Sequence, residues 1–98
     1  MRVHRFFYFK GGSMEEKRLA VIGITVEKSD SAMEVNHILH DYGEYIIGRI
    51  GVPYQNRQMS VITIILDAPQ NLVSSLSGKL GMLTGIYAKT MYLKVGEE

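Results

Sequence analysis

Cysteine is absent from the 98-residue sequence. Its absence excludes disulfides, a thiol nucleophile, zinc-finger sites and cysteine-ligated iron–sulfur clusters, and it makes the cytoplasm the simplest expected location. Long hydrophobic runs are also missing, because no apolar segment approaches the roughly 20 residues that a membrane-spanning helix needs. We therefore expect no membrane-embedded part.

The sequence also lacks a surplus of either charge. Eleven Lys and Arg residues stand against ten Asp and Glu residues, which gives a formal net charge of +1. Binding along a phosphate backbone requires a basic surplus, so nucleic acid is not the expected partner. The length is that of a single domain.

Residues 1–13, MRVHRFFYFKGGS, differ from the rest of the chain. They combine basic residues with an aromatic cluster, but their apolar part is too short for a signal peptide. Three interpretations stay open: Met14 is the true start, the segment is a remnant of cloning, or it adds an edge strand. We assign it no function and expect the domain to span residues 14–98.

Residues 45–66 carry the clearest structural pattern. Two runs rich in β-branched residues, Tyr45–Val52 and Met59–Leu66, are joined by turn residues, which is typical of a β-hairpin. In the second run, one face carries Ile62, Ile64 and Leu66, and the other carries Val61 and Ile65. A strand that is apolar on both faces is expected in the middle of a sheet covered on both sides.

The segments around the hairpin predict two more strands and two helices. Leu19–Val26 is a continuous apolar run of strand length, and Gly85–Val95 alternates in the manner of a strand. A first helix is expected from near Ser31 to Gly43, with Ser29 or Asp30 as its N-cap. Its apolar side comprises Ala32, Val35, Ile38, Leu39 and Tyr42.

The second helix is expected after Asp67-Ala68-Pro69, with Pro69 in its first turn and Gly81 as its stop. Its apolar positions are Leu72, Val73, Leu76 and Leu80. Gly78 lies inside this helix at a cost of about 1 kcal/mol relative to alanine, which we interpret as a place of close backbone approach.

This order of elements predicts an α+β fold, the ferredoxin-like βαββαβ two-layer sandwich. Right-handed crossovers place the first and third strands at the centre of a four-stranded antiparallel sheet, with both helices on one face. The residues expected on the other face are Tyr45, Ile47, Tyr87, Met91 and Leu93. Because monomers rarely expose so much apolar surface, we predict a homo-oligomer, a dimer or a tetramer. The alternative is that the N-terminal aromatic segment covers this face.

Two groups of residues are candidates for binding chemistry. His37 and His40 could contribute to a metal site, although two imidazoles on a solvent face are more often plain polar surface. Arg49, Tyr54 and Arg57 could clamp a carboxylate or phosphate, and the alternative is an edge strand kept soluble by its charges.

Support for catalysis is weak. No nucleophile–base pair is visible, and Asp67 is better explained as an ordering residue at a strand end. Gly78, Lys79 and Gly81 lack the spacing of a phosphate-binding loop, so we assign them to packing and capping. We expect no enzyme and no cofactor.

A further set of residues carries a family resemblance. They are Arg49-Ile50-Gly51-Val52-Pro53-Tyr54, Arg57, Ser60-Val61-Ile62, Leu66-Asp67-Ala68 and Ser77-Gly78-Lys79-Leu80-Gly81-Met82-Leu83-Thr84-Gly85. With these residues the sequence resembles the iron-only hydrogenase system regulator family over about residues 15–94. That family consists of small ACT-like proteins similar to the ligand-binding domain of nickel-responsive regulators.

The resemblance implies an oligomeric regulatory domain that influences hydrogenase expression or maturation. In ACT-like domains effectors commonly settle between subunits near the loop after the first strand. In this sequence that loop comprises Glu27, Lys28, Ser29, Asp30 and Ser31.

Two departures restrict what the resemblance implies. Thirteen residues before Met14 cannot supply the ribbon-helix-helix DNA reader of nickel-responsive regulators, which argues against direct DNA binding. Their nickel site uses histidines and a cysteine, and this chain has no cysteine.

Our leading hypothesis is therefore a non-enzymatic regulatory module, in which a small-molecule effector shifts subunit packing and a protein partner reads the change. The alternative is a purely structural oligomerisation or protein-interaction module. Only the first predicts a small molecule that changes the melting temperature or the oligomeric state.

Overall fold

The computed structural model describes residues 16–27 and 31–96. Its strands are β1 (Lys17–Val26), β2 (Ile46–Tyr54), β3 (Met59–Pro69) and β4 (Ile86–Tyr92), and its α-helices are α1 (Ala32–Asp41) and α2 (Gln70–Gly81). Two short 3-10 helices, η2 (Gly43–Tyr45) and η3 (Gln55–Arg57), flank β2. The predicted order is confirmed, while the N-terminal segment 1–13 and the proposed caps Ser29 and Asp30 lie outside the described residues.

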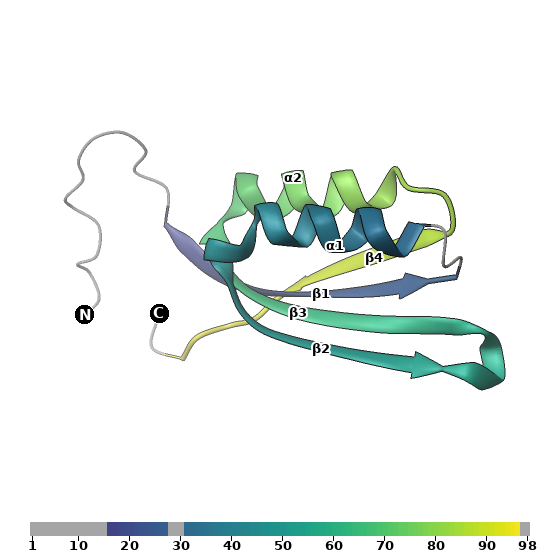
Figure 1. Cartoon of the computed structure of the whole chain (residues 1–98). Helices are drawn as coiled ribbons and strands as arrows, with labels where there is room; N and C mark the ends of the chain where they lie inside the picture. The colour runs from purple at the N-terminus through teal and green to yellow at the C-terminus, as the bar shows by residue number, and fades with distance from the viewer. Residues whose placement is uncertain (1–15, 28–30, 97–98) are drawn as a thin grey trace.

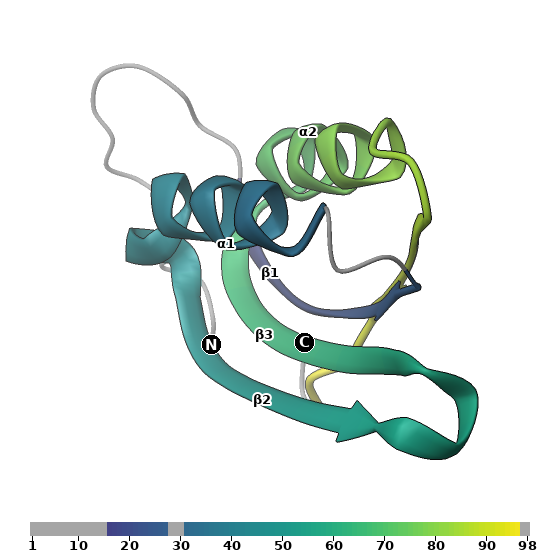
Figure 2. The same ribbon diagram turned by 45° about the vertical axis from the view of Figure 1, so that its right-hand side comes forward.

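The four strands form one antiparallel sheet in the order β2-β3-β1-β4. The two most continuously apolar strands, β1 and β3, are central, as predicted. Both helices cover the same face of the sheet (Figure 1), and the sheet curves strongly along β2 and β3 (Figure 2). The ferredoxin-like prediction is therefore confirmed.

The hydrophobic core lies between the helices and the sheet. Alternate residues of the central strands fill it, namely Ala20, Ile22, Ile24 and Val26 of β1 and Ile62, Ile64, Leu66 and Ala68 of β3. The helices contribute Val35, Leu39, Val73, Leu76 and Leu80. Each large side chain buried here stabilises the fold by about 1.5–3 kcal/mol relative to exposure.

The hairpin is longer than its apolar pattern indicates. β2 continues through Pro53 to Tyr54, because an edge strand tolerates a proline that donates no hydrogen bond. Gln58 closes the turn in a left-handed conformation, with a φ of 52°. At the other end, β3 continues to Pro69 instead of stopping at Leu66.

The second helix differs from expectation at its start and in its middle. Pro69 is the N-cap in extended conformation and not a first-turn residue. The helix does end at Gly81, but the left-handed glycine of this region is Gly85, with a φ of 76°. The close backbone approach expected at Gly78 is wrong, because a Cβ there would meet no heavy atom of the described chain within 4 Å apart from its own helical turn.

Candidate functional site

The candidate site is the sheet face turned away from the helices, which we call the open face. It is formed by odd-numbered residues of β1, β3 and β4 and by even-numbered residues of β2 from Gly48 onward, as the strand register requires. Its strongly exposed apolar side chains are Ile50 (63%), Val52 (50%), Tyr54 (45%), Tyr87 (61%), Met91 (56%) and Leu93 (38%).

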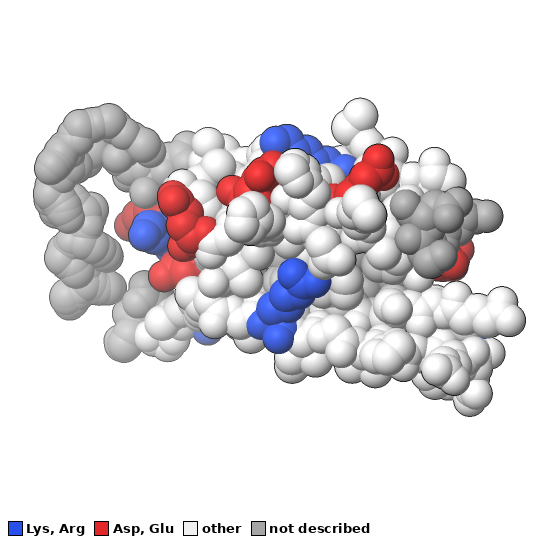
Figure 3. All heavy atoms as spheres, viewed as in Figure 1, with Lys and Arg blue, Asp and Glu red and all other residues white. Residues whose placement is uncertain are grey.

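The register arranges the middle of this face in three rows across β2, β3, β1 and β4. The rows are Gly48-Ile65-Val21-Met91, Ile50-Thr63-Gly23-Lys89 and Val52-Val61-Thr25-Tyr87. Lys89 is the only charged residue in these three rows, and it stands on an edge strand. Figure 3, which views the molecule from the edge at β2, shows few charged side chains toward the hairpin, whereas acidic and basic side chains both lie over the helices.

A register shift between Ile46 and Gly48 decides which residues of β2 reach the open face. Ile46 pairs with Leu66 and, like Tyr45, packs against the core. The placement of Tyr45 on the open face is therefore wrong, while Ile47 lies at the irregularity and is 64% exposed. A hydrogen bond with Glu44 is the main cause that raises the pKa of the Tyr45 hydroxyl above its usual value.

The register shift also explains why the sequence pattern did not predict Ile50 and Val52 on the open face. One extra residue in an edge strand reverses the side-chain alternation after it, so Ile50 and Val52 face outward. Gly48 at the irregularity was the only available signal, since glycine inside a strand often marks a bulge. Tyr87 and Met91 face the open side as expected, and Leu93 follows them beyond the end of β4; their part in an oligomer interface stays a prediction.

The predicted anion clamp is not assembled within this chain. Arg49 pairs with Ile64 on the helix side of the sheet, and its guanidinium donates a hydrogen bond to Asn36 Oδ1 of α1. Tyr54 points to the open face, and Arg57 lies in η3 at the tip of the hairpin. These three side chains therefore do not converge on one ligand.

The histidine pair remains on the exposed surface of α1. His37 Nε2 is 3.8 Å from Asp41 Oδ2, one helical turn away, and His40 is exposed as well. Within residues 16–27 and 31–96, no group of three His, Cys, Asp or Glu side chains could hold a metal ion.

The loop after β1 is tied to the segment before β4. The Glu27 amide donates to the Gly85 carbonyl at 2.8 Å, and the buried Ser31 hydroxyl donates to the Thr84 carbonyl at 2.8 Å. The other predicted effector-binding residues, Lys28, Ser29 and Asp30, lie outside the described residues. None of the helices in the described part of the chain has the length and apolar character needed to cross a membrane.

Comparison with known proteins identifies the family. A family model named TM1266-like, with the description "Iron-only hydrogenase system regulator, putative", matches residues 18–90. The chain belongs to the TM1266-like family. The resemblance seen in the sequence is thereby confirmed.

A solved structure supports the same assignment. The uncharacterized protein TM1266 from Thermotoga maritima is 35% identical to this chain, with a TM-score of 0.78 over 81% of this chain and 100% of that one. No curated protein matches the chain.

Proposed function

We propose that this TM1266-like protein is a non-enzymatic regulator of an iron-only hydrogenase system that works as a homo-oligomer joined through the open face. The observation that carries the proposal is the six strongly exposed apolar side chains on one side of a four-stranded sheet. The description of the family as a regulator supports a regulatory role over a catalytic one.

The size of the apolar surface supports self-association. Six large apolar side chains that are 38–63% exposed together present several hundred Å², which is at the upper end of the patch that a typical monomer exposes and is often a sign of an interaction site. A second copy presents the same apolar surface, and a two-fold axis brings the two together without leaving an unpaired apolar face. Lys89, at the edge, can keep its ammonium group in water while its stem packs.

Self-association gives the protein a means of regulation. A small molecule that binds one arrangement of subunits better than another shifts the population between them, and a protein partner can recognise the change. A purely structural module would associate in the same way but would show no such ligand.

The decisive experiment introduces the same substitution at two exposed methionines. Met91 is 56% exposed on the open face, whereas Met33 is 81% exposed on α1. We expect Met91→Lys to convert the oligomer to monomers in sedimentation equilibrium, because a charge would be buried against apolar surface. Met33→Lys is expected to leave the oligomer intact.

Three results would contradict the proposal: a wild-type protein that sediments as a monomer at high concentration, an oligomer that survives Met91→Lys, or one that dissociates equally with Met33→Lys. A thermal-shift panel of amino acids and nucleotides then separates regulator from structural module. A compound that changes both the melting temperature and the sedimentation coefficient supports the regulator.

A further inference from the structure

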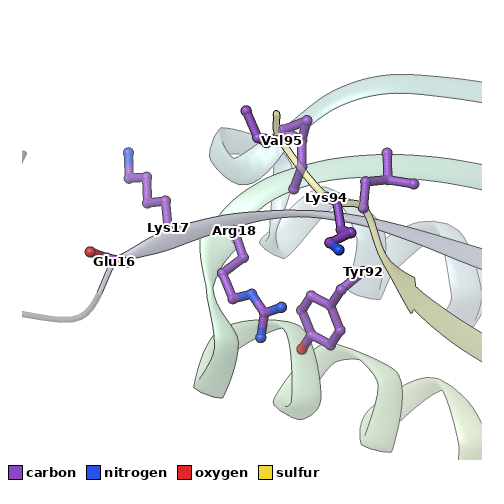
Figure 4. Close-up of a pocket in the computed structure, with 8 residues that line it drawn as sticks. Glu16, Lys17, Arg18, Tyr92, Lys94 and Val95 are labelled. Atoms are coloured by element: carbon purple, nitrogen blue, oxygen red, sulfur yellow. The ribbon is translucent and has the colours of Figure 1, made fainter. Parts of the chain in front are cut away.

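A hollow opens where β1 and β4 separate, at the end of the sheet opposite the hairpin (Figure 4). Pairing between these strands ends near Ala20 and Tyr92, and the last backbone hydrogen bond joins the Leu93 amide to the Leu19 carbonyl at 3.0 Å. Beyond it the strands diverge and enclose a cavity volume of 310 Å³. This lies at the lower end of the sizes typical of small-molecule sites.

The helix side of the hollow holds a positioned guanidinium. Arg18 lies over the ring of Tyr92, with its Cζ 4.3 Å from the ring centroid, and its Nη1 donates to Gln70 Oε1 at 3.4 Å. Lys94 lines the hollow as well, and Figure 4 shows its side chain pointing toward the side that holds Tyr92. Because the ring already restrains Arg18, less conformational entropy is lost when its remaining N–H groups bind a ligand.

The opposite side of the hollow is mainly apolar. Leu19, Leu93 and Val95 line it, and Figure 4 shows Val95 and Lys17 on the side of β1 away from Arg18. Leu19 and Leu93 also belong to the edge of the open face. The hollow therefore joins a cationic wall to an apolar wall that continues into the open face.

The balance of charge in the lining is positive. Lys17, Arg18 and Lys94 line the hollow together with a single carboxylate, that of Glu16. Among residues 16–27 and 31–96, the contact within salt-bridge distance is that of His37 with Asp41, so none of these three cations is paired with a carboxylate of the described chain. Arginine can donate two parallel hydrogen bonds to a carboxylate or a phosphate, and the apolar lining by Leu19, Leu93 and Val95 favours a carboxylate that carries an apolar body.

We propose that this hollow binds a small organic carboxylate, with its charged group on Arg18 and Lys94 and a short apolar body against Leu19, Leu93 and Val95. The proposed binding depends on the hollow alone. An effect of the ligand on subunit packing rests on the proposed function, because a ligand at Leu19 and Leu93 would touch the rim of the subunit interface.

The test is a titration of the ¹⁵N-labelled full chain, followed by amide chemical shifts. The probes are isovalerate and isovaleramide, which share one apolar body and differ in charge. We expect saturable shifts at residues 17–19 and 92–95 with isovalerate, with a Kd of about 1 mM, as suits a fragment of this size. Isovaleramide and inorganic phosphate are each expected to bind at least tenfold more weakly.

Matched variants locate the site. Arg18→Gln is expected to weaken isovalerate binding at least tenfold, and Lys94→Gln provides a second variant should Arg18→Gln fail to fold. Lys79→Gln is the control, because Lys79 also lies over a tyrosine ring, that of Tyr42, but on α2. It should leave the Kd unchanged.

Several outcomes would overturn the site: no saturable shift, equal binding of isovaleramide or phosphate, or an unchanged Kd in both hollow variants. Met91→Lys distinguishes this failure from failure of the proposed function. If Met91→Lys still binds isovalerate, the hollow is supported whether or not the protein oligomerises. If the wild-type protein oligomerises but does not bind isovalerate, the open-face proposal is supported and the hollow is refuted.

Discussion

The two faces of the sheet are built from the same strands but differ completely in their surroundings. On the helix side Ile64 is 0% exposed, whereas Ile50, in the adjacent strand on the open face, is 63% exposed. Both faces carry aliphatic side chains. The difference teaches that hydrophobic composition alone does not separate a core from an interaction surface, since among residues 16–27 and 31–96 only the helix side of the sheet is covered.

The polar groups of the two faces differ as well. On the helix side, the hydroxyl of the buried Tyr42 shares a hydrogen bond of 2.8 Å with the hydroxyl of Ser75, an exposed residue of α2. The middle of the open face holds the threonines Thr25 and Thr63, Gly23 and the edge cation Lys89. A surface of this kind stays compatible with water and can still pack closely against a partner.

The largest expected effect comes from shortening adjacent isoleucines on the two faces. Ile64→Ala removes a fully buried side chain and is expected to lower the free energy of unfolding by about 2–5 kcal/mol. Ile65→Ala, on the open face, should cost about 1 kcal/mol in the isolated subunit, because its side chain is only partly buried. Urea denaturation at low protein concentration measures both.

Repeating that denaturation at high concentration sharpens the comparison. If the open face is buried between subunits, the cost of Ile65→Ala grows with protein concentration and that of Ile64→Ala does not. Equal costs for the two substitutions at low concentration would mean that the faces are not energetically distinct.

A smaller effect is expected from the polar pair beside the core. Tyr42→Phe removes this hydrogen bond and should cost about 0.5–1 kcal/mol, because the exposed Ser75 hydroxyl can bind water instead. Ser75→Ala removes the same bond, so the double variant should cost less than the sum of the two single variants. A double-mutant cycle in thermal denaturation measures the coupling, and a coupling energy of zero would show that the pair contributes nothing.

The smallest effect, of opposite sign, is expected on the outer surface of the helix layer. Gly78→Ala places a methyl group in open space and should raise the stability by about 0.5–1 kcal/mol, because alanine restricts the unfolded chain and favours the helix. Gly85→Ala is the matched control. Its φ of 76° strains any residue with a Cβ, so it should be destabilising in the same thermal denaturation.

Most of the fold could be predicted because apolar side chains follow two simple periods, alternation in the strands and helical spacing in the helices. Alternation in Ile62, Ile64 and Leu66 correctly predicted the buried face of β3, and the helical spacing of Leu76 and Leu80 correctly predicted that of α2. Tyr87 and Met91 were placed on the open face for the same reason. Gly78 was misjudged because a glycine in a helix is compatible with either a close contact or open solvent, and only the packing distinguishes them.

The binding residues were less predictable. Arg49, Tyr54 and Arg57 are close in sequence, but strand alternation and the hairpin turn send their side chains in different directions. Arg18 and Lys94 are distant in sequence and lie beside one hollow. No local pattern signals such a pairing.

The sequence by itself determined the order of the elements, the central position of β1 and β3, and the apolar character of both sheet faces, because these depend on side-chain periodicity and on the handedness of the crossovers. Tertiary structure alone decided which residues of β2 face outward and where β1 and β4 part. A one-residue shift in pairing reverses every later side chain of an edge strand, and the end of a ladder depends on neighbouring strands that the local sequence does not contain.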